Sequence, residues 1–200
     1  MILWKNYLNN IILKNWVYNK GTNRNKLNKK LRRIIMDITF AGNKVNLVGE
    51  EIKVGDKAPV FKATKNDLSE WSSESCENKV VVYSVAPSLD TSVCALQAKR
   101  FNKEAAGLGG VNVVTITEDL PFAQERFCSN EGIENTIMIS DYQNREFGEK
   151  YGFLMDENKL LARGVVVVDK DGIVQYVEYV PEVTDEVDFD RALEEVKKLI

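Results

Sequence analysis

An apolar run at residues 80–86, interrupted only by Ser84, leads through a short loop into a helical pattern, and this succession most constrains the fold. Such a run is typical of a central strand that is buried on both faces of a sheet. Residues 92–108 predict a helix, because apolar side chains recur at helical spacing and Gly109-Gly110 follows them. Residues 111–117 predict the next strand. The order predicts a β-α-β unit of an α/β protein.

The flanking segments predict a β-hairpin before this unit and a second strand pair after it. Gly42-Asn43 and Lys170-Asp171-Gly172 are the turn signals of the two pairs. The expected elements are strands at 37–41, 44–48 and near 60–63, a helix at 119–130 with Asp119 as its N-cap, a strand at 137–139, a short helix at 145–151, strands at 163–169 and 173–179, and a last helix at 189–199.

Length and composition indicate one globular domain. The chain has 200 residues, of which 44% are hydrophobic and 28% charged, and this is enough to bury a substantial core. Residues 36–200 contain no Gly/Ser-rich linker, low-complexity tract or internal repeat. We therefore expect a single folded domain over residues 36–200.

The first 35 residues differ sharply in charge from the rest. They hold nine Lys/Arg and no Asp/Glu, which leaves 18 basic and 30 acidic residues in the body. The acidic body argues against nucleic-acid binding, and the longest apolar run of the extension, residues 11–13, is far short of the roughly 20 residues of a membrane span. A phosphate-binding or transit segment is one reading of this extension. The reading we favour is a disordered extension or a translated leader, with Met36 as the true start, because Arg32-Arg33 can be encoded by a purine-rich ribosome-binding sequence.

The chain contains no histidine and only three cysteines. The absence of histidine excludes Ser-His-Asp and Cys-His catalysis and most catalytic zinc sites. Three cysteines without a C-x-x-C pair disfavour a disulfide scaffold, a zinc ribbon or a thioredoxin-type dithiol. A cysteine activated by backbone groups and arginine is the remaining candidate nucleophile, and we expect neither a metal nor an organic cofactor.

Cys94 has the sequence context of such a nucleophile. The loop at residues 87–91 runs directly into the predicted helix, which places this thiol in the first turn. Unpaired N–H groups and the positive end of the helix dipole favour an anion there. We therefore expect Cys94 to react as a thiolate.

Two segments carry a family resemblance. Pro87, Thr91 and Cys94 form the pattern Pro-x-x-x-Thr-x-x-Cys, and residues 119–128 spell Asp-Leu-Pro-Phe-Ala-Gln-Glu-Arg-Phe-Cys. In both segments the chain resembles the peroxiredoxins, and within them the thiol peroxidase branch, from about Met36 to Ile200. The resemblance implies a thioredoxin-like fold with an N-terminal β-hairpin.

The same resemblance implies a mechanism that requires no cofactor. Cys94 would attack a hydroperoxide, either hydrogen peroxide or an organic one, and become a sulfenic acid. Thr91 would hold its hydroxyl near the sulfur, Pro87 would limit water around the thiolate, and Arg163 would stabilise charge on the sulfur and the peroxide oxygens.

Cys128 matches the resolving cysteine of the family, which would condense with oxidised Cys94 into an intrachain disulfide that thioredoxin reopens. If both cysteines begin in intact helices, their Cα atoms are expected to lie too far apart for a bridge, so local unwinding must accompany oxidation. The resemblance also suggests a homodimer built through the loops around the active site. The need for re-reduction favours a reducing cytoplasm.

Two other functions remain open from the sequence. A peroxide sensor would share the chemistry of Cys94 but pass its oxidation to a partner protein. A thioredoxin-fold binding or chaperone module would not turn over peroxide at all. Cys76 matches no functional position and is interpreted as a spectator thiol.

Overall fold

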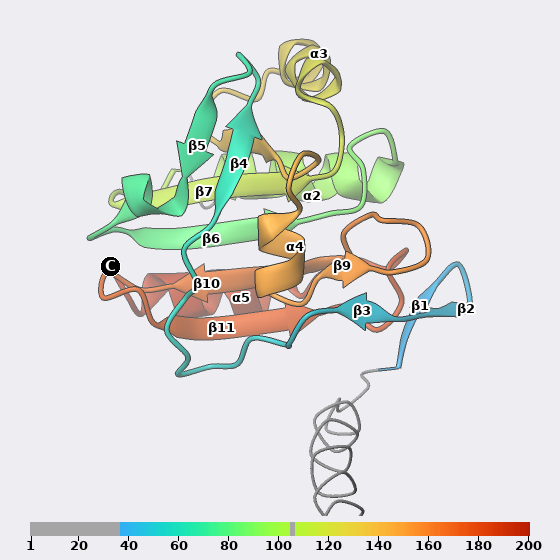
Figure 1. Cartoon of the computed structure of the whole chain (residues 1–200). Helices are drawn as coiled ribbons and strands as arrows, with labels where there is room; N and C mark the ends of the chain where they lie inside the picture. The colour runs from blue at the N-terminus through green and yellow to red at the C-terminus, as the bar shows by residue number, and fades with distance from the viewer. Residues whose placement is uncertain (1–36, 105–106) are drawn as a thin grey trace, which may run out of the picture. The chain divides into compact units, whose positions relative to one another are not determined.

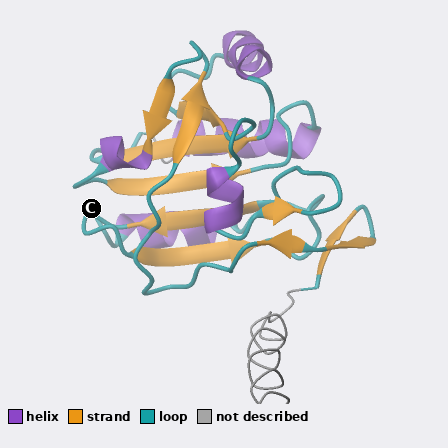
Figure 2. Cartoon of the chain, in the orientation of Figure 1, coloured by secondary structure: helices purple, strands orange, loops and turns teal. Residues whose placement is uncertain are grey.

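The computed structural model describes residues 37–104 and 107–200 (Figures 1 and 2). The interpretation of residues 1–35 lies outside these residues. The helices are α2 (Ser92–Glu104), α3 (Pro121–Glu131), α4 (Glu146–Lys150), α5 (Phe189–Lys197) and the 3₁₀ turn η1 (Ser73–Cys76). The strands are β1 (Ile38–Phe40), β2 (Asn43–Val45), β3 (Leu47–Val48), β4 (Lys62–Lys65), β5 (Glu70–Ser72), β6 (Val80–Val85), β7 (Val111–Thr117), β8 (Ile137–Ser140), β9 (Leu154–Met155), β10 (Gly164–Val168) and β11 (Val174–Tyr179).

Seven of these strands form one mixed sheet in the order β11-β10-β6-β7-β8-β4-β5. β6, β7 and β8 are parallel, whereas β10 runs antiparallel to β6 and β4 antiparallel to β8. All six residues of β6 are buried, as its apolar run predicts for a central strand. The predicted β-α-β unit is therefore present as β6-α2-β7.

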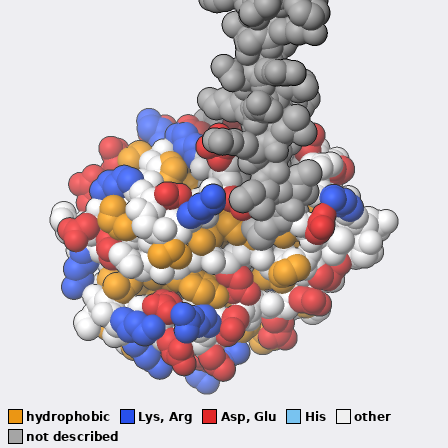
Figure 3. Space-filling model, turned by 90° about the horizontal axis from the view of Figure 1, so that it is seen from below, with side chains coloured by type: hydrophobic (Ala, Val, Ile, Leu, Met, Phe, Trp, Pro, Cys, Tyr) orange, Lys and Arg blue, Asp and Glu red, His pale blue; other side chains and the backbone are white. Residues whose placement is uncertain are grey.

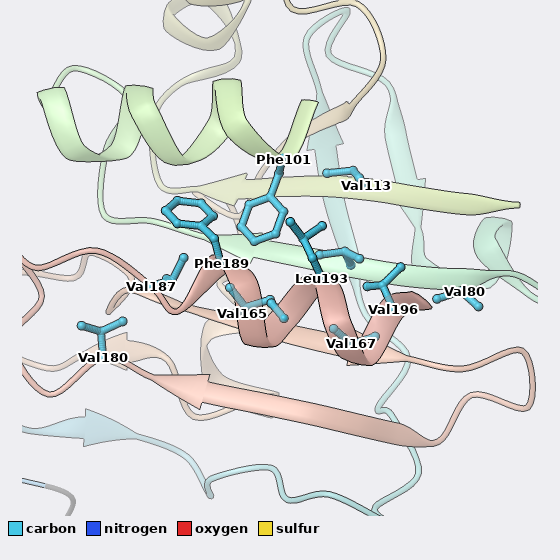
Figure 4. Packing of buried hydrophobic residues seen from close by; sticks show 12 residues of the cluster. Val80, Phe101, Val113, Val165, Val167, Val180, Val187, Phe189, Leu193 and Val196 are labelled. Carbon is cyan, nitrogen blue, oxygen red and sulfur yellow. The ribbon is translucent and has the colours of Figure 1, made fainter. Parts of the chain in front are cut away.

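Helices cover both faces of this sheet. In Figure 1, α2 and α5 lie behind it and α4 lies in front. The core behind the sheet is formed by valines of the strands, by Phe101 of α2 and by the apolar side of α5, which contributes Phe189, Leu193 and Val196 (Figure 4). These residues recur at helical spacing along α5, and this is why one face of that helix is buried.

The other face carries an aromatic cluster. Phe61 contacts Trp71, Tyr83, Phe147 and Tyr151, with ring centroids 5.1–5.6 Å apart. Tyr83 comes from β6, where its neighbours Val82 and Ser84 point to the opposite face, as strand alternation requires. The cluster packs α4 against the sheet and includes Trp71 of the sheet's edge strand β5.

The N-terminal hairpin differs in detail from the prediction. Its turn is formed by Ala41 and Gly42, both with positive φ, while Asn43 already belongs to β2. The second predicted stretch is divided, since β2 pairs with β1 whereas β3 pairs with β9. The sequence analysis did not predict β5, which pairs with β4 through a turn that contains Leu68.

On the part of the surface that is coloured by residue type in Figure 3, acidic and basic side chains are interspersed, with apolar side chains between them. Within residues 37–104 and 107–200, no helix is long and apolar enough to cross a membrane.

Candidate active site

Cys94 lies at the junction of β6 and α2. β6 ends at Val85, the chain passes through the buried Pro87, and α2 begins at Ser92, so that Cys94 occupies the first turn as predicted. Its side chain is fully buried and the thiol is free. The backbone groups at the start of a helix favour negative charge at this position.

Two side chains donate hydrogen bonds to the Cys94 sulfur. Thr91 Oγ1 lies 2.7 Å from Cys94 Sγ, and Arg163 Nη2 lies 3.1 Å from it. Thr91 is one helical turn before the cysteine, whereas Arg163 is 69 residues away in sequence. A hydroxyl and a guanidinium directed at one sulfur can also donate to the oxygens of a molecule bound next to it.

Sheet topology explains why Arg163 reaches this sulfur. β10 is antiparallel to β6, and Gly164 at its start pairs with Val85 at the end of β6. The residue before β10 therefore lies where the Cys94 loop begins. A Cβ atom at Gly164 would overlap the carbonyl oxygen of Glu178 and contact the ring of Phe153, so this glycine allows close packing beside Arg163.

The buried Arg163 side chain has two further partners. Its Nη1 donates to Gln97 Oε1 at 2.8 Å, and its Nε donates to the carbonyl oxygen of Val183 at 2.8 Å. Gln97 is itself buried, and its Nε2 donates to Ser84 Oγ at 3.0 Å. The sequence analysis did not single out Gln97. The sequence feature that could have pointed to Gln97 is its position one turn after Cys94, where a polar residue falls on the helix face that packs against the sheet.

The Val183 carbonyl is held in place by the N-terminal hairpin. Val183 N donates to the carbonyl oxygen of Thr39, and Glu182 accepts hydrogen bonds from Thr39 Oγ1 and from the backbone of Ala41 and Gly42. Hydrogen bonds, with that of Thr184 first, lower the pKa of Glu182 to about 2. The hairpin thus supports the loop that orients Arg163.

Replacing Gln97 by leucine is expected to lower kcat/KM for peroxide reduction by about tenfold, because a buried guanidinium N–H loses its acceptor. Steady-state assays of the Gln97→Leu enzyme test this. Asn102→Leu, which alters a half-buried amide on the same helix whose Oδ1 accepts from Asn135 N, serves as the control. Equal kcat/KM in the Gln97→Leu and parent enzymes would show that Arg163 does not depend on this contact.

Asp119 does not cap α3 as predicted. The N-cap position belongs to Leu120 and has no side-chain hydrogen bond, with Pro121 starting the helix. The Asp119 carboxylate instead accepts hydrogen bonds from Ser88 Oγ and Leu89 N, both at 2.7 Å. These residues lie in the Cys94 loop. The Asp119 carboxylate therefore binds a segment that is distant in sequence instead of the N–H groups at the start of α3.

Cys128 lies in α3 and is half-buried. It packs with Phe127 against a small cluster that contains Leu89 of the Cys94 loop and Ala98 of α2. Burial raises the pKa of the Cys128 thiol, while a hydrogen bond with Asn66 lowers it by a smaller effect. Cys128 is thus a protonated neighbour of the Cys94 loop at neutral pH.

Cys76, by contrast, is buried in η1.

A groove of about 310 Å³ opens beside Thr91, between the start of α2 and α3. Its lining includes Leu89, Thr91, Ala95, Ala123, Arg126 and Phe127. The groove offers space for a substrate beside the residue that contacts the Cys94 sulfur.

Glu118 is a buried carboxyl group at the end of β7. Neither oxygen has a hydrogen-bond partner within the described parts of the chain, and Arg145 Nε lies 3.9 Å from Oε2. Burial raises the pKa of Glu118 to about 8, with Asp141 adding to the effect and Arg145 opposing it. Burial likewise raises the pKa of Asp141 to about 6.

Glu118→Gln is therefore expected to stabilise the protein at alkaline pH. Since the pKa of this carboxyl is higher in the folded than in the unfolded state, it lowers the free energy of unfolding progressively as pH rises from 4.5 to about 8. Glutamine removes this effect, so the gain should be ~1–3 kcal/mol at pH 8 and much smaller at pH 5. Urea unfolding at both pH values, with the exposed Glu125→Gln as control, measures it. An equal gain at both pH values would contradict this assignment.

Comparisons with known proteins show which family the chain belongs to. Residues 53–193 match the Redoxin family model. The chain is 48% identical to the thiol peroxidase of Bacillus subtilis (strain 168) over 82% of this chain and 98% of the relative, and 46% identical to that of Streptococcus pneumoniae (strain ATCC BAA-255 / R6) over 81% and 99%.

Solved structures give the same result. A peroxiredoxin-like protein from Aquifex aeolicus is 43% identical and superposes with a TM-score of 0.77, covering 82% of this chain and 96% of that one. The thiol peroxidase from Chromobacterium violaceum, at 20% identity and a TM-score of 0.73 over 80% and 95%, shares the fold. The predicted thioredoxin-like α/β fold is confirmed. The chain belongs to the thiol peroxidases of the redoxin family, enzymes that use a thiol reductant to reduce peroxides.

Proposed function

We propose that Cys94 is the peroxidatic cysteine of this thiol peroxidase and reduces hydrogen peroxide and organic hydroperoxides. The observation that supports this assignment is the buried Cys94 sulfur at the start of α2, which receives hydrogen bonds from Thr91 and Arg163. The thiolate attacks the terminal peroxide oxygen and the O–O bond breaks. The departing alkoxide or hydroxide takes up a proton and leaves as alcohol or water, and Cys94 becomes a sulfenic acid.

In this proposal the neighbouring side chains serve the displacement. Thr91 and Arg163 orient the peroxide and stabilise negative charge as it moves from sulfur to the departing oxygen. Pro87 is buried in the loop that leads to Cys94 and lacks an N–H group, so it limits the access of water to the thiolate. No metal or organic cofactor takes part.

We further propose that Cys128 resolves the sulfenic acid. The Cys128 sulfur, once deprotonated, attacks the Cys94 sulfur, water leaves, and an intrachain disulfide forms. Because both cysteines lie in helices, we expect α3 to open locally before the sulfurs meet. Hydrogen exchange on reduced and oxidised protein tests this, and unchanged protection across α3 would contradict the proposed opening.

A dithiol partner, thioredoxin, is proposed to reopen the disulfide. The decisive assay couples peroxide consumption to NADPH through thioredoxin and thioredoxin reductase, with parent, Cys94→Ser and Cys128→Ser enzymes. We expect turnover only in the parent. Turnover that is lost only in Cys76→Ser would overturn the assignment of both active cysteines.

The alternative function is a peroxide sensor that passes oxidation to a partner protein. It rests on the same Cys94 geometry as the enzyme. In the sensor, however, oxidised Cys94 forms a disulfide with a client protein and not with Cys128. Oxidised Cys128→Ser protein would then accumulate as a mixed disulfide with a client other than thioredoxin. Fast NADPH-coupled turnover of the parent favours the enzyme instead.

We also propose a homodimer in a reducing cytoplasm. Leu120 and Phe122, at the start of α3, are 52% and 60% exposed and supply apolar surface beside the active-site loops. Sedimentation of the reduced protein should give twice the chain mass. A monomer at micromolar concentration would contradict the dimer.

A further inference from the structure

Asp119 joins the two segments that carry the active cysteines. We propose that it is a positioning residue which latches the Cys94 loop to the start of α3 in the reduced enzyme, and that this latch slows disulfide formation. The inference rests on the proposed disulfide between Cys94 and Cys128 and adds a residue that controls when it forms.

The latch consists of one carboxylate with partners on both sides. Asp119 Oδ1 accepts from Ser88 Oγ at 2.7 Å, and Oδ2 accepts from Leu89 N at 2.7 Å and from Thr117 Oγ1 at 2.9 Å. Ser88 and Leu89 lie between β6 and α2, whereas Thr117 is the last residue of β7 and Asp119 lies between β7 and α3. Hydrogen bonds to an ionised carboxylate are about twice as strong as neutral ones, so this contact is well suited to hold the two segments together.

The loop side of the latch leads to the reactive sulfur. The carbonyl oxygen of Ser88 accepts a hydrogen bond from the backbone N–H of Thr91 at 3.4 Å. Thr91 Oγ1 in turn contacts Cys94 Sγ at 2.7 Å. The carboxylate of Asp119 thus supports the loop conformation in which Thr91 faces the sulfur.

The other side of the latch leads to the helix of Cys128. The main chain of Asp119 is fixed by Ser140 Oγ, which donates to its carbonyl oxygen. The chain then passes directly into α3, where Gln124 Nε2 donates to Thr117 Oγ1 at 3.0 Å. Movement of α3 away from the Cys94 loop must therefore break the contacts of the Asp119 carboxylate or pull the loop with it.

These contacts affect the two chemical steps differently. The closed arrangement holds Thr91 and Arg163 at the sulfur and serves the reaction with peroxide. The open arrangement is needed for Cys128 to reach Cys94. Removing the latch raises the population of the open arrangement, so disulfide formation should accelerate while the peroxide step does not. General destabilisation of the fold has no reason to separate the steps in this way.

The test measures both steps in single turnover. The peroxide step is followed by competition with a reference peroxidase for hydrogen peroxide, and disulfide formation by acid quench and mass mapping of the Cys94 and Cys128 peptides. Asp119→Ala should form the disulfide about tenfold faster, the effect of losing roughly 1.4 kcal/mol of closed-state preference. Its peroxide step should be unchanged or up to about threefold slower.

Two further variants keep the test independent of folding yield. Asn at position 119 can still accept from Leu89 N and can donate to the Ser88 hydroxyl, so Asp119→Asn should lie between Asp119→Ala and the parent. Ser88→Ala removes the Oδ1 contact, together with the hydrogen bond that Asp90 N donates to Ser88 Oγ at 3.3 Å, and it should accelerate disulfide formation by a smaller factor.

Asp169→Ala is the matched control. Like Asp119, Asp169 accepts three hydrogen bonds, here from two backbone N–H groups and the Gln175 side chain, but it lies at the far end of β10 from Arg163. The control should leave both steps unchanged. Acceleration in Asp169→Ala, or an unchanged or slower disulfide step in the Asp119 variants, would overturn the latch.

The parent enzyme separates the two proposals. If peroxide gives no disulfide between Cys94 and Cys128 in the parent, both the resolving role of Cys128 and the latch are wrong. If the parent forms this disulfide and the Asp119 variants form it at the same rate, only the latch is wrong.

Discussion

Cys94→Ser is expected to lower peroxidase activity by at least about a thousandfold while leaving the fold intact. Serine has nearly the shape of cysteine, and its hydroxyl can accept the hydrogen bonds from Thr91 and Arg163 that the sulfur receives. The variant should therefore unfold near the parent temperature. A hydroxyl is a far weaker nucleophile toward peroxide than a thiolate, so the chemical step is lost.

The coupled assay with thioredoxin, thioredoxin reductase and NADPH measures this effect as kcat/KM. Cys76→Ser is the matched control, because it removes a buried thiol that contacts none of the proposed catalytic groups, and it should retain near-parent activity. More than a tenth of parent activity in Cys94→Ser would contradict the role of Cys94.

Arg163→Met should lower kcat/KM for hydrogen peroxide by about 10²–10³-fold, the usual effect of losing a charged donor at a reacting centre. The substitution removes the Nη2 contact to Cys94 Sγ and leaves Gln97 Oε1 and the Val183 carbonyl oxygen without their donor. Because buried acceptors lose their donor, Arg163→Met should also unfold at a lower temperature than the parent, so kcat/KM is compared per folded enzyme.

Two other arginine variants show whether the loss comes from the contacts of the Arg163 guanidinium or from its charge alone. Arg163→Lys keeps the charge but not the planar fork that contacts three partners, and it should recover only part of the activity. Arg191→Met removes an exposed guanidinium that pairs with Glu195 on α5, and it should leave kcat/KM unchanged. Equal losses in Arg163→Met and Arg191→Met would point to net charge rather than to the Arg163 contacts.

The sequence predicts the centre of the fold well because the relevant signals are local. The apolar run of β6, the helical spacing of α2 and the loop between them place Cys94 in a first helical turn, and the structure confirms this arrangement. The turn of the hairpin is shifted, however, because Ala41 and Gly42 take the positive φ values that Gly42-Asn43 was expected to supply.

Contacts between distant segments were harder to predict. Only the family resemblance pointed to Arg163, since its place beside Cys94 depends on the antiparallel pairing of β10 with β6. Gln97 was overlooked because a single polar residue on a helix carries no sign of what it faces. Asp119 has the residue type and position of an N-cap, but two donors from the Cys94 loop compete for its carboxylate.

The most direct test of the account asks which sulfur peroxide oxidises first. Cys128→Ser protein is treated with one equivalent of hydrogen peroxide in the presence of dimedone, and the tagged peptides are identified by mass spectrometry. The account predicts one tag, on the peptide that contains Cys94. A tag on Cys76, or no tag while peroxide is consumed, would contradict it.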